Sequence, residues 1–304
     1  MTARPIKKIA CIGEVMVELI VAGKDSAVLN VAGDTYNTAV YLARLLGGQG
    51  VSYVTALGRD SFSDRAAAQI AREGLDTDHV TRHDSRNIGL YAIETDAAGE
   101  RSFTYWRGDS AARTLFSDPA TAVDLDTFDL VFLSGITLAI LPPQSRVNLM
   151  AALDAFRVGG GQVAYDSNHR PRLWESPQMA RDVNAQMWRR TDIALPSVDD
   201  EMLIYGETGA AEVLARLSAH GLLRGALKRG PLGPVGLSGQ GRDAPFPPVT
   251  KVVDTTAAGD SFNAGFLSQI TLGQTQEMAL FTGHAIASQV IQAKGAIVPV
   301  SLPE

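Results

Sequence analysis

The chain has 304 residues, of which 45% are hydrophobic and 20% are charged, and these values are typical of one globular domain with a sizeable core. The net charge of −6 and the lack of a long Lys/Arg run exclude a polynucleotide as an expected partner. The single cysteine, Cys11, lies in an apolar run, which excludes an internal disulfide and predicts a buried thiol in a reducing compartment. The longest apolar run, 130–141, is about half of the roughly 20 residues that a membrane span needs. We therefore expect a soluble cytoplasmic protein with no nucleic-acid and no membrane partner.

Short β-rich runs alternate with longer amphipathic stretches along most of the chain. The expected strands are 8–13, 51–57, 130–133, 162–166, 193–196, 225–228 and 234–237. The expected helices are 35–46, 61–73, 144–156, 260–272 and 278–293. This alternation predicts one α/β domain over 1–304, with a mostly parallel sheet covered by helices on both faces.

Two segments, 14–31 and 88–107, break this alternation because each reads as strands without an intervening helix. In the second, a turn at 96–99 separates two β-rich runs, which is typical of a hairpin. We expect both segments to form a small sheet that covers the main domain as a lid. Such a lid would exclude water from a group-transfer reaction.

The most informative motif is the string DTTAAGDSFNAG at residues 254–265. The small residues Ala257, Ala258 and Gly259 precede a helix, so backbone N–H groups at its N-terminus can approach an anion. Asp260 at the helix start can accept a proton from an incoming hydroxyl. The alternative is that Asp260 is only a helix cap. A cap, however, requires none of the three small residues before it.

This string resembles the second signature of the ribokinase-like (phosphofructokinase-B) carbohydrate kinases. The resemblance implies a three-layer α/β sandwich with a small β-sheet lid, Asp260 as the catalytic base, and Ala257, Ala258 and Gly259 as the anion hole. Residues 32–39, AGDTYNTA, are similar to the N-terminal sugar-binding loop of that family, although Thr35 stands where a small residue is expected. Within the family, this loop and the strings at 89–95, 99–107, 133–141, 166–174 and 294–299 resemble the 2-keto-3-deoxygluconate kinases.

The resemblance implies an anionic sugar-acid substrate. The residues implied to contact it are Gly33, Asp34, Asn37, Tyr91, Tyr105, Arg107 and Arg170. The guanidinium fork of arginine suits a carboxylate because it forms two parallel hydrogen bonds. Three alternatives stay open: Asp34 or Thr35 as a helix N-cap, Tyr91 and Tyr105 as a cross-strand packing pair, and each arginine as a solvated side chain.

The chain has no P-loop motif, so ATP must be bound in another way. The resemblance implies that ATP lies near residues 228–233, where Pro231 and Leu232 depart from the subfamily. The residues implied for the nucleotide are Asn168, Ser197, Lys228, Gly230, Gly233 and His284. The alternative for His284 is a packed or exposed helical side chain that does not contact the nucleotide.

Mg²⁺ is expected because the β- and γ-phosphates need charge neutralisation. Asp200 is the candidate carboxylate, within an acidic cluster that also fits a helix N-terminus. The family resemblance further implies a monovalent cation such as K⁺ beside the anion hole, with oxygens from Asp254, Thr256 and Gly295.

The expected reaction is phosphorylation of the terminal hydroxyl of 2-keto-3-deoxygluconate by ATP. The alternatives are another sugar or keto-sugar-acid kinase of the family, and a non-catalytic sugar-acid sensor on the same scaffold. A dinucleotide-binding oxidoreductase fits the fold class but not the sequence after the first strand, where Gly13 and Glu14 replace a glycine-rich turn. Exposed strand edges in the lid predict a homo-oligomer.

Overall fold

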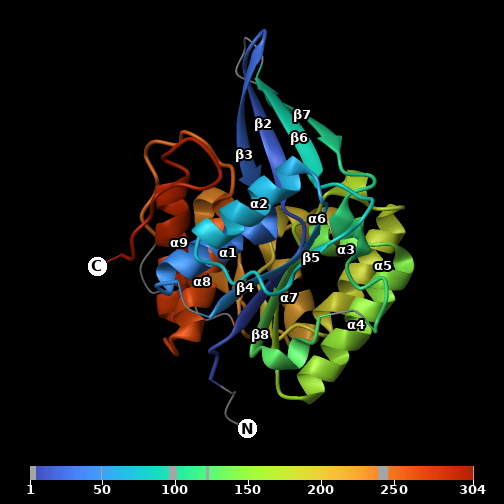
Figure 1. Ribbon diagram of the computed structural model, residues 1–304. Coiled ribbons are helices and arrows are strands. Elements are labelled where there is room, and N and C mark those ends of the chain that lie inside the picture. The colour runs from blue at the N-terminus through green and yellow to red at the C-terminus, as the bar shows by residue number, and fades with distance from the viewer. Residues whose placement is uncertain (1–4, 49, 96–100, 121–122, 239–245, 304) are drawn as a thin grey trace.

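A six-stranded parallel sheet forms the middle layer of the computed structural model, which describes residues 5–48, 50–95, 101–120, 123–238 and 246–303 (Figure 1). The strand order is β10-β9-β8-β1-β4-β5. The bounds are β1 Ile9–Ile12, β4 Val51–Leu57, β5 Val80–Arg82, β8 Leu130–Ser134, β9 Gln162–Asp166 and β10 Ile193–Ala194. Every pair of neighbours is parallel, which confirms the predicted sheet.

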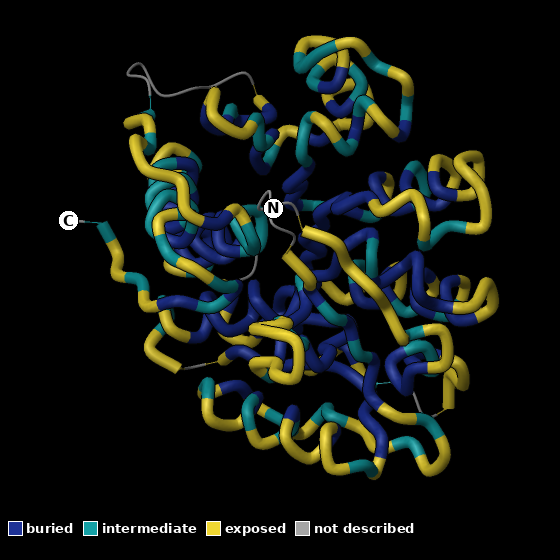
Figure 2. The backbone as a smooth tube through the Cα atoms, turned by 90° about the horizontal axis from the view of Figure 1, so that it is seen from above, coloured by how far each residue is buried: buried dark blue, intermediate teal, exposed yellow. Residues whose placement is uncertain are grey.

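Helices cover both faces of this sheet, and the residues of β1 show why. Ile9 and Cys11 belong to one buried apolar cluster, whereas Ala10 and Ile12 belong to the other. Successive residues of a strand point to opposite faces, so an entirely apolar strand needs a core on each side. Seen from above, the buried backbone accordingly fills the middle of the molecule (Figure 2). The helices are α1 Asp34–Leu45, α2 Ser61–Arg72, α3 Gly135–Ile140, α4 Pro143–Val158, α5 Pro177–Trp188, α6 Val198–Tyr205, α7 Ala210–Ala219, α8 Ala258–Thr271 and α9 Gln276–Val290.

A second sheet of four strands, here called the lid, stands apart from the main sheet (Figure 1). Its order is β3-β2-β6-β7, with bounds β2 Met16–Gly23, β3 Ser26–Ala32, β6 Gly89–Thr95 and β7 Arg101–Trp106. The central pair β2–β6 is parallel, and the two outer pairs are antiparallel. Because β2 starts shortly after β1 ends, the lid lies at the carboxyl edge of the main sheet. The predicted segments therefore do form a separate sheet, although the turn at 96–99 lies outside the described residues.

The structure differs from the sequence predictions near the end of the main sheet. The segments expected as its last strands form a separate antiparallel pair, β11 Ala226–Leu227 and β12 Val235–Gly236. Two single parallel bridges, Ala194–Gly225 and Ser197–Lys228, attach this pair to the main sheet beside β10. Helix α8 begins at Ala258 rather than at Asp260. Helices α3, α5, α6 and α7 were not predicted, and α3 is an apolar run whose periodicity does not distinguish a helix from a strand.

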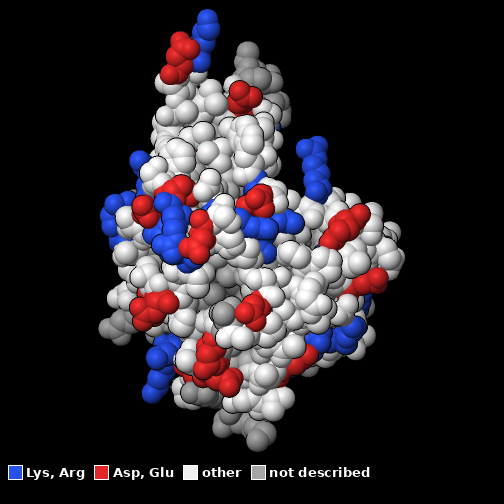
Figure 3. All heavy atoms as spheres, turned by 45° about the vertical axis from the view of Figure 1, so that its right-hand side comes forward, with Lys and Arg blue, Asp and Glu red and all other residues white. Residues whose placement is uncertain are grey.

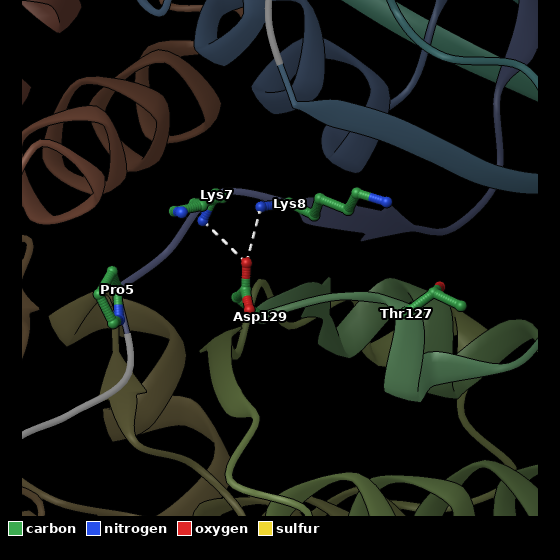
Figure 4. A pocket seen from close by; sticks show the side chains of 5 residues that line it. All are labelled: Pro5, Lys7, Lys8, Thr127 and Asp129. Atoms are coloured by element: carbon green, nitrogen blue, oxygen red, sulfur yellow. Dashed lines mark hydrogen bonds between the residues drawn. The ribbon is translucent and has the colours of Figure 1, made fainter.

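A cavity of about 340 Å³ lies at the opposite, amino edge of the main sheet, beside the residues that precede β1 and β8 (Figure 4). The backbone N–H groups of Lys7 and Lys8 donate to Asp129 there, over 2.9 and 3.0 Å. Ligands of open α/β sheets bind at the carboxyl edge, so this cavity is not part of the site described below. Among the helices of the described ranges, none has the length and apolarity to span a bilayer.

Candidate active site

The loop before α8 has the geometry of an anion-binding site. Ala257 is the N-cap residue of α8 and has the left-handed conformation, with φ 60° and ψ 16°. The N–H of Ala258 donates to the carbonyl of Thr255, and the N–H of Ser261 donates to the carbonyl of Ala257. Within the described residues, the N–H groups of Gly259 and Asp260 have no hydrogen-bond acceptor. Free N–H groups at a helix N-terminus are donors for an anionic ligand.

Asp260 is held by α1 and is not a helix cap. Its carboxylate accepts a hydrogen bond from Asn37 Nδ2 at 2.9 Å, and its carbonyl accepts one from Thr38 Oγ1 at 3.2 Å. The N-cap position of α8 belongs to Ala257, and no side chain caps that helix end. The capping alternative is therefore wrong, and the side chain is directed at α1 across the site.

The surroundings of Asp260 make its carboxyl group unusually basic. Burial, together with the nearby charges of Asp34 and Asp166, raises the pKa of Asp260 to about 8, although the Asn37 hydrogen bond and the Lys228 charge lower it. A carboxylate with a raised pKa accepts a proton from a hydroxyl more readily than an ordinary aspartate does. The position thus suits a general base.

Lys228 brings a positive charge to the same place. Its Nζ atom lies 2.5 Å from Asp166 Oδ2 and 3.1 Å from Asn263 Oδ1. Asp166 is the buried last residue of β9, so it comes to the carboxyl edge of the sheet. A Cβ atom added to Gly259 would be 3.7 Å from Lys228 Nζ, so the ammonium group adjoins the anion-binding loop. The lysine can neutralise part of the charge of a bound phosphate.

Asn168 links β9 to the start of α1. Its Nδ2 donates to Asp34 Oδ2 at 2.7 Å, and its backbone N–H donates to Asp166 Oδ1 at 3.1 Å. Asn168 has a positive φ of 28°, a conformation that asparagine tolerates better than most residues. The network therefore joins Asp34, predicted for the sugar, to Asn168, predicted for the nucleotide.

Gly33 is the N-cap residue of α1, so the capping alternative for Asp34 and Thr35 is wrong. Its N–H donates to Asn37 Oδ1 at 3.4 Å. A Cβ atom at this position would overlap the carbonyl oxygen of Glu14. The close approach of α1 to the residue just before the lid thus requires a glycine.

A row of polar side chains crosses three neighbouring strands of the lid, β2, β6 and β7. The register pairs Glu18 with Tyr91, and Tyr91 with Tyr105. The hydroxyl of Tyr91 donates to Glu18 Oε2 at 2.5 Å, and the two tyrosine rings stack with centroids 5.6 Å apart. Burial and the charge of Glu18 raise the pKa of Tyr91, which keeps its hydroxyl protonated. The prediction that Tyr91 and Tyr105 share a face is confirmed, and they also form the cross-strand pair of the alternative reading.

Arg107 of the site forms an ion pair with another residue of the protein. Its guanidinium group forms an ion pair with the buried carboxylate of Glu14, which also accepts a hydrogen bond from Ser110. Gly89 leaves room for this pair, since a Cβ atom there would lie 2.8 Å from Glu14 Oε1. The buried Nε of Arg107 has no hydrogen-bond partner among the described residues. Arg107 therefore keeps donor capacity for a ligand while Glu14 fixes its position.

Comparison with known proteins gives the same picture. Residues 6–303 match the family model described as pfkB family carbohydrate kinase. The chain belongs to the pfkB family of carbohydrate kinases. It is 46% identical to the 2-dehydro-3-deoxygluconokinase of Dickeya dadantii and 45% identical to that of Escherichia coli K12, over 96–97% of this chain and 97% of each relative. The structure of a putative ribokinase II from E. coli in complex with ATP and Mg²⁺ has a TM-score of 0.82 at 21% identity, covering 96% of this chain and 94% of that one.

In this pfkB-family kinase, several residues predicted for the nucleotide lie together. Ser197, just before α6, and Lys228, just after β11, form an isolated parallel bridge. Gly233 packs against Phe246, and the ring of Phe246 also contacts that of His284 at a centroid distance of 4.9 Å. The Nε2 atom of His284 is 2.9 Å from the carbonyl oxygen of Pro247. Gly230, with φ 54°, begins the turn at 230–232, whose Leu232 is exposed.

Two acidic residues in the first turn of α6 have different surroundings. Glu201 is fully buried and bonds to Arg216 at 2.7 Å. Asp200 faces the site, with Arg170 Nη1 at 4.0 Å from its Oδ1. Burial and the charge of Asp166 raise the pKa of Asp200 to about 6, against the opposing effects of Arg170 and Lys228. No group of three or more metal-ligating side chains occurs among the described residues, so a Mg²⁺ ion here would need phosphate oxygens and water as further ligands.

Four charged side chains that the sequence analysis assigned no role in the site belong to it or border it: Asp166, Glu14, Glu18 and Arg101. Asp166 could have been found, since it ends a predicted strand at the carboxyl edge. Glu14, Glu18 and Arg101 carried no such signal, because their partners are distant in sequence or belong to another strand.

Proposed function

We propose that this kinase transfers the γ-phosphoryl group of ATP to the terminal hydroxyl of 2-keto-3-deoxygluconate, also called 2-dehydro-3-deoxygluconate. The products are 2-keto-3-deoxy-6-phosphogluconate and ADP. The observation that carries the proposal is the position of the Asp260 carboxylate. It is hydrogen-bonded to Asn37 and lies beside the free N–H groups at the N-terminus of α8. The names of the curated relatives support the choice of substrate.

The proposed roles follow from the geometry. Asp260 accepts the proton of the attacking hydroxyl, whose oxygen forms the new bond to phosphorus as the bond to the β-phosphate oxygen breaks. The N–H groups of Gly259 and Asp260, which have no acceptor among the described residues, and the ammonium group of Lys228 stabilise the charge on the transferred group. Asp34 bonds to Asn168 and Asn37 bonds to Asp260, and we assign both residues to the sugar hydroxyls.

The carboxylate of the substrate is assigned to the lid side. Arg107 retains unpaired N–H donors beside Tyr105, and its guanidinium carbon lies 5.9 Å from the ring centroid of Tyr105. Tyr91 keeps a protonated hydroxyl next to this pair. Arg170 is the second cation proposed for the sugar acid, and it follows β9 at the carboxyl edge. A neutral sugar has no group that would require these arginines.

ATP is proposed to lie between the 228–233 turn and α9, with contacts from Asn168, Ser197, Lys228, Gly230, Gly233 and His284. Mg²⁺ would be held by Asp200 together with the phosphates, and it would neutralise charge on the β- and γ-phosphates. The donor set fits such an ion because Asp200 already faces the network of Asp166 and Lys228.

The experiment is a coupled ADP-release assay with 2-keto-3-deoxygluconate, its C4 epimer, fructose and ribose. The expected result is turnover of the keto-deoxy acid with kcat/KM at least about 100-fold above that for fructose, because a neutral sugar leaves the buried donors of Arg107 unpaired. Turnover of fructose alone would assign a neutral-sugar kinase. No ADP release with any acceptor would support a non-catalytic sensor.

A homo-oligomer that forms through the lid, in the cytoplasm, is part of the proposal. Val28, Phe103, Tyr105 and Trp106 of the lid are exposed, and Trp106 retains 59% of its accessible surface. The lid face seen in Figure 3 carries its charged side chains mainly toward the tip. Exposed apolar side chains on an open sheet edge favour association of two copies. Light scattering should give at least a dimer, and a monomer at micromolar concentration would contradict this part of the proposal.

A further inference from the structure

Arg101 of the lid donates hydrogen bonds to the loop that forms the anion hole. Its Nη1 and Nη2 atoms lie 2.8 and 2.9 Å from the two carboxylate oxygens of Asp254, and Nη1 also donates to Thr256 Oγ1 at 3.0 Å. The two partners are 153 residues apart in sequence. A two-pronged arginine–carboxylate pair is among the strongest and most directional polar contacts in proteins. It joins β7 to the residues directly before Ala257.

The carboxylate of Asp254 is fully engaged by donors. Besides Arg101, it accepts hydrogen bonds from the N–H and hydroxyl of Thr256, at 3.0 and 2.7 Å, and from the N–H of Gly295 at 3.0 Å. Only 3% of the Asp254 side chain is exposed. These donors, led by Arg101, hold the pKa of Asp254 below its usual range against the effect of burial. Asp254 is therefore an anion in a closed cage of N–H and O–H groups.

This arrangement does not fit the monovalent cation that the family resemblance implies at Asp254, Thr256 and Gly295. Such a cation is coordinated by oxygen atoms that replace its water. Gly295 and Thr256 instead present N–H groups to the carboxylate, and the guanidinium group of Arg101 stands against both of its oxygens. A cation could bind Asp254 only by displacing a positive charge that the protein itself supplies.

The loop before α8 depends on such contacts because its backbone is strained at Ala257. Ala257 holds a left-handed conformation that costs a non-glycine residue on the order of 1–2 kcal/mol, and such conformations persist when their surroundings fix them. The apolar cluster of Met16, Tyr91 and Ile93 in the lid packs against Ala257 as well. Lid and loop thus meet through one charged and one apolar contact.

We propose that Arg101 takes the place of the activating monovalent cation, so that the lid itself supplies the positive charge that organises the anion hole. Arg101 is in this sense a positioning residue, since it acts through Asp254 on the 257–259 loop. The inference rests on the proposed kinase function, and it predicts an enzyme that needs no K⁺. Loss of Arg101 should create a cation requirement that the native protein lacks.

The test compares KCl with tetramethylammonium chloride at equal ionic strength, which removes general salt screening as a variable. For the native protein we expect the ADP-release rate to differ by less than about twofold between the salts and the unfolding temperature to be the same in both. For Arg101→Ala we expect a rate about tenfold lower in tetramethylammonium, comparable to the loss of a side chain that orients the groups in direct contact with a reacting centre. KCl or guanidinium chloride should restore part of that rate and raise the unfolding temperature of the variant. Arg59→Ala is the matched control, because the ion pair of Arg59 among the described residues is with the exposed Asp84.

Three results would overturn the inference. They are strong K⁺ activation or K⁺ stabilisation of the native protein, an Arg101→Ala variant as fast as the native enzyme without K⁺, and a slow variant that no cation rescues. If Arg101→Ala does not fold, Arg101→Lys keeps the charge but not the fork, and it should need no K⁺. If the native protein phosphorylates no sugar acid, the proposed function fails, whereas the unfolding temperatures in the two salts still decide the cation question.

Discussion

The side-chain amide of Asn37 donates to the carboxylate of Asp260 across 2.9 Å, although 223 residues separate the two in sequence. This bond fixes the direction of the Asp260 carboxylate beside the anion-binding loop. It also explains why the loop at 32–39 and the string at 254–265 occur together in one chain: they are the two halves of one site.

The raised pKa of Asp260 predicts a pH-dependent cost in stability. Because the folded-state pKa of about 8 lies above the usual aspartate value of 3.8, the folded protein binds this proton more tightly than the unfolded chain does. The contribution of the group to stability is therefore full below the unfolded pKa and is lost as the pH rises toward 8. Asp260→Asn removes the titration and can still accept the Asn37 hydrogen bond. The measured quantity is the unfolding temperature of Asp260→Asn minus that of the native protein. This difference should be at least about 2 °C larger at pH 8 than at pH 5.

The difference between the two proteins is the relevant quantity, since groups remote from Asp260 titrate equally in both. If the unfolding temperatures of native protein and Asp260→Asn differ by the same amount at pH 5 and pH 8, the pKa of Asp260 is not raised in the folded protein.

The Arg107–Glu14 pair predicts a non-additive pair of substitutions. Arg107→Met leaves the buried Glu14 carboxylate without its cation, which typically costs about 3–5 kcal/mol. The double variant Arg107→Met/Glu14→Gln should recover much of that stability in urea unfolding. Both variants should raise KM for the sugar acid at least about tenfold, because the donor for the substrate carboxylate is lost in each. Recovery of substrate affinity along with stability would show that Arg107 only neutralises Glu14.

Lys228 is predicted to act on the transferred phosphate. Lys228→Met should lower kcat about 100-fold while the KM for the sugar acid changes little, since the ammonium group adjoins Gly259 and is separated from Asp34 by Asp166 and Asn168. Lys251→Met is the control, because Lys251 is an exposed lysine outside the network. A change in the KM for the sugar acid with an unchanged kcat would show that Lys228 binds the sugar acid rather than the transferred phosphate.

The fold was largely predictable because its strands are short, apolar and clearly bounded. Strands β4 and β9 lie where the sequence predicted them, residue for residue. Helix α3 was missed because an uninterrupted apolar run carries no period. The separate β11–β12 pair was missed because strand partners depend on topology, which the local sequence pattern does not specify.

The site was predictable where one local string carries the chemistry and not where distant residues share it. Asp260 and the small residues before it are adjacent in sequence, so their roles could be inferred together. The pairing of Arg107 with Glu14, and of Arg101 with Asp254, depends on how the lid lies on the main domain. No local pattern records that contact, and Arg107 alone looked like a free cation.

The most direct test of the account is the rate of phosphoryl transfer from ATP to 2-keto-3-deoxygluconate by Asp260→Asn, under saturating substrates at pH 8. Loss of the general base should lower kcat about 1,000-fold while both substrates still bind. Calorimetric titration of the variant with ATP and with the sugar acid would verify that binding. A variant that binds both substrates and turns over at the native rate would contradict the central claim that the Asp260 carboxylate accepts the proton.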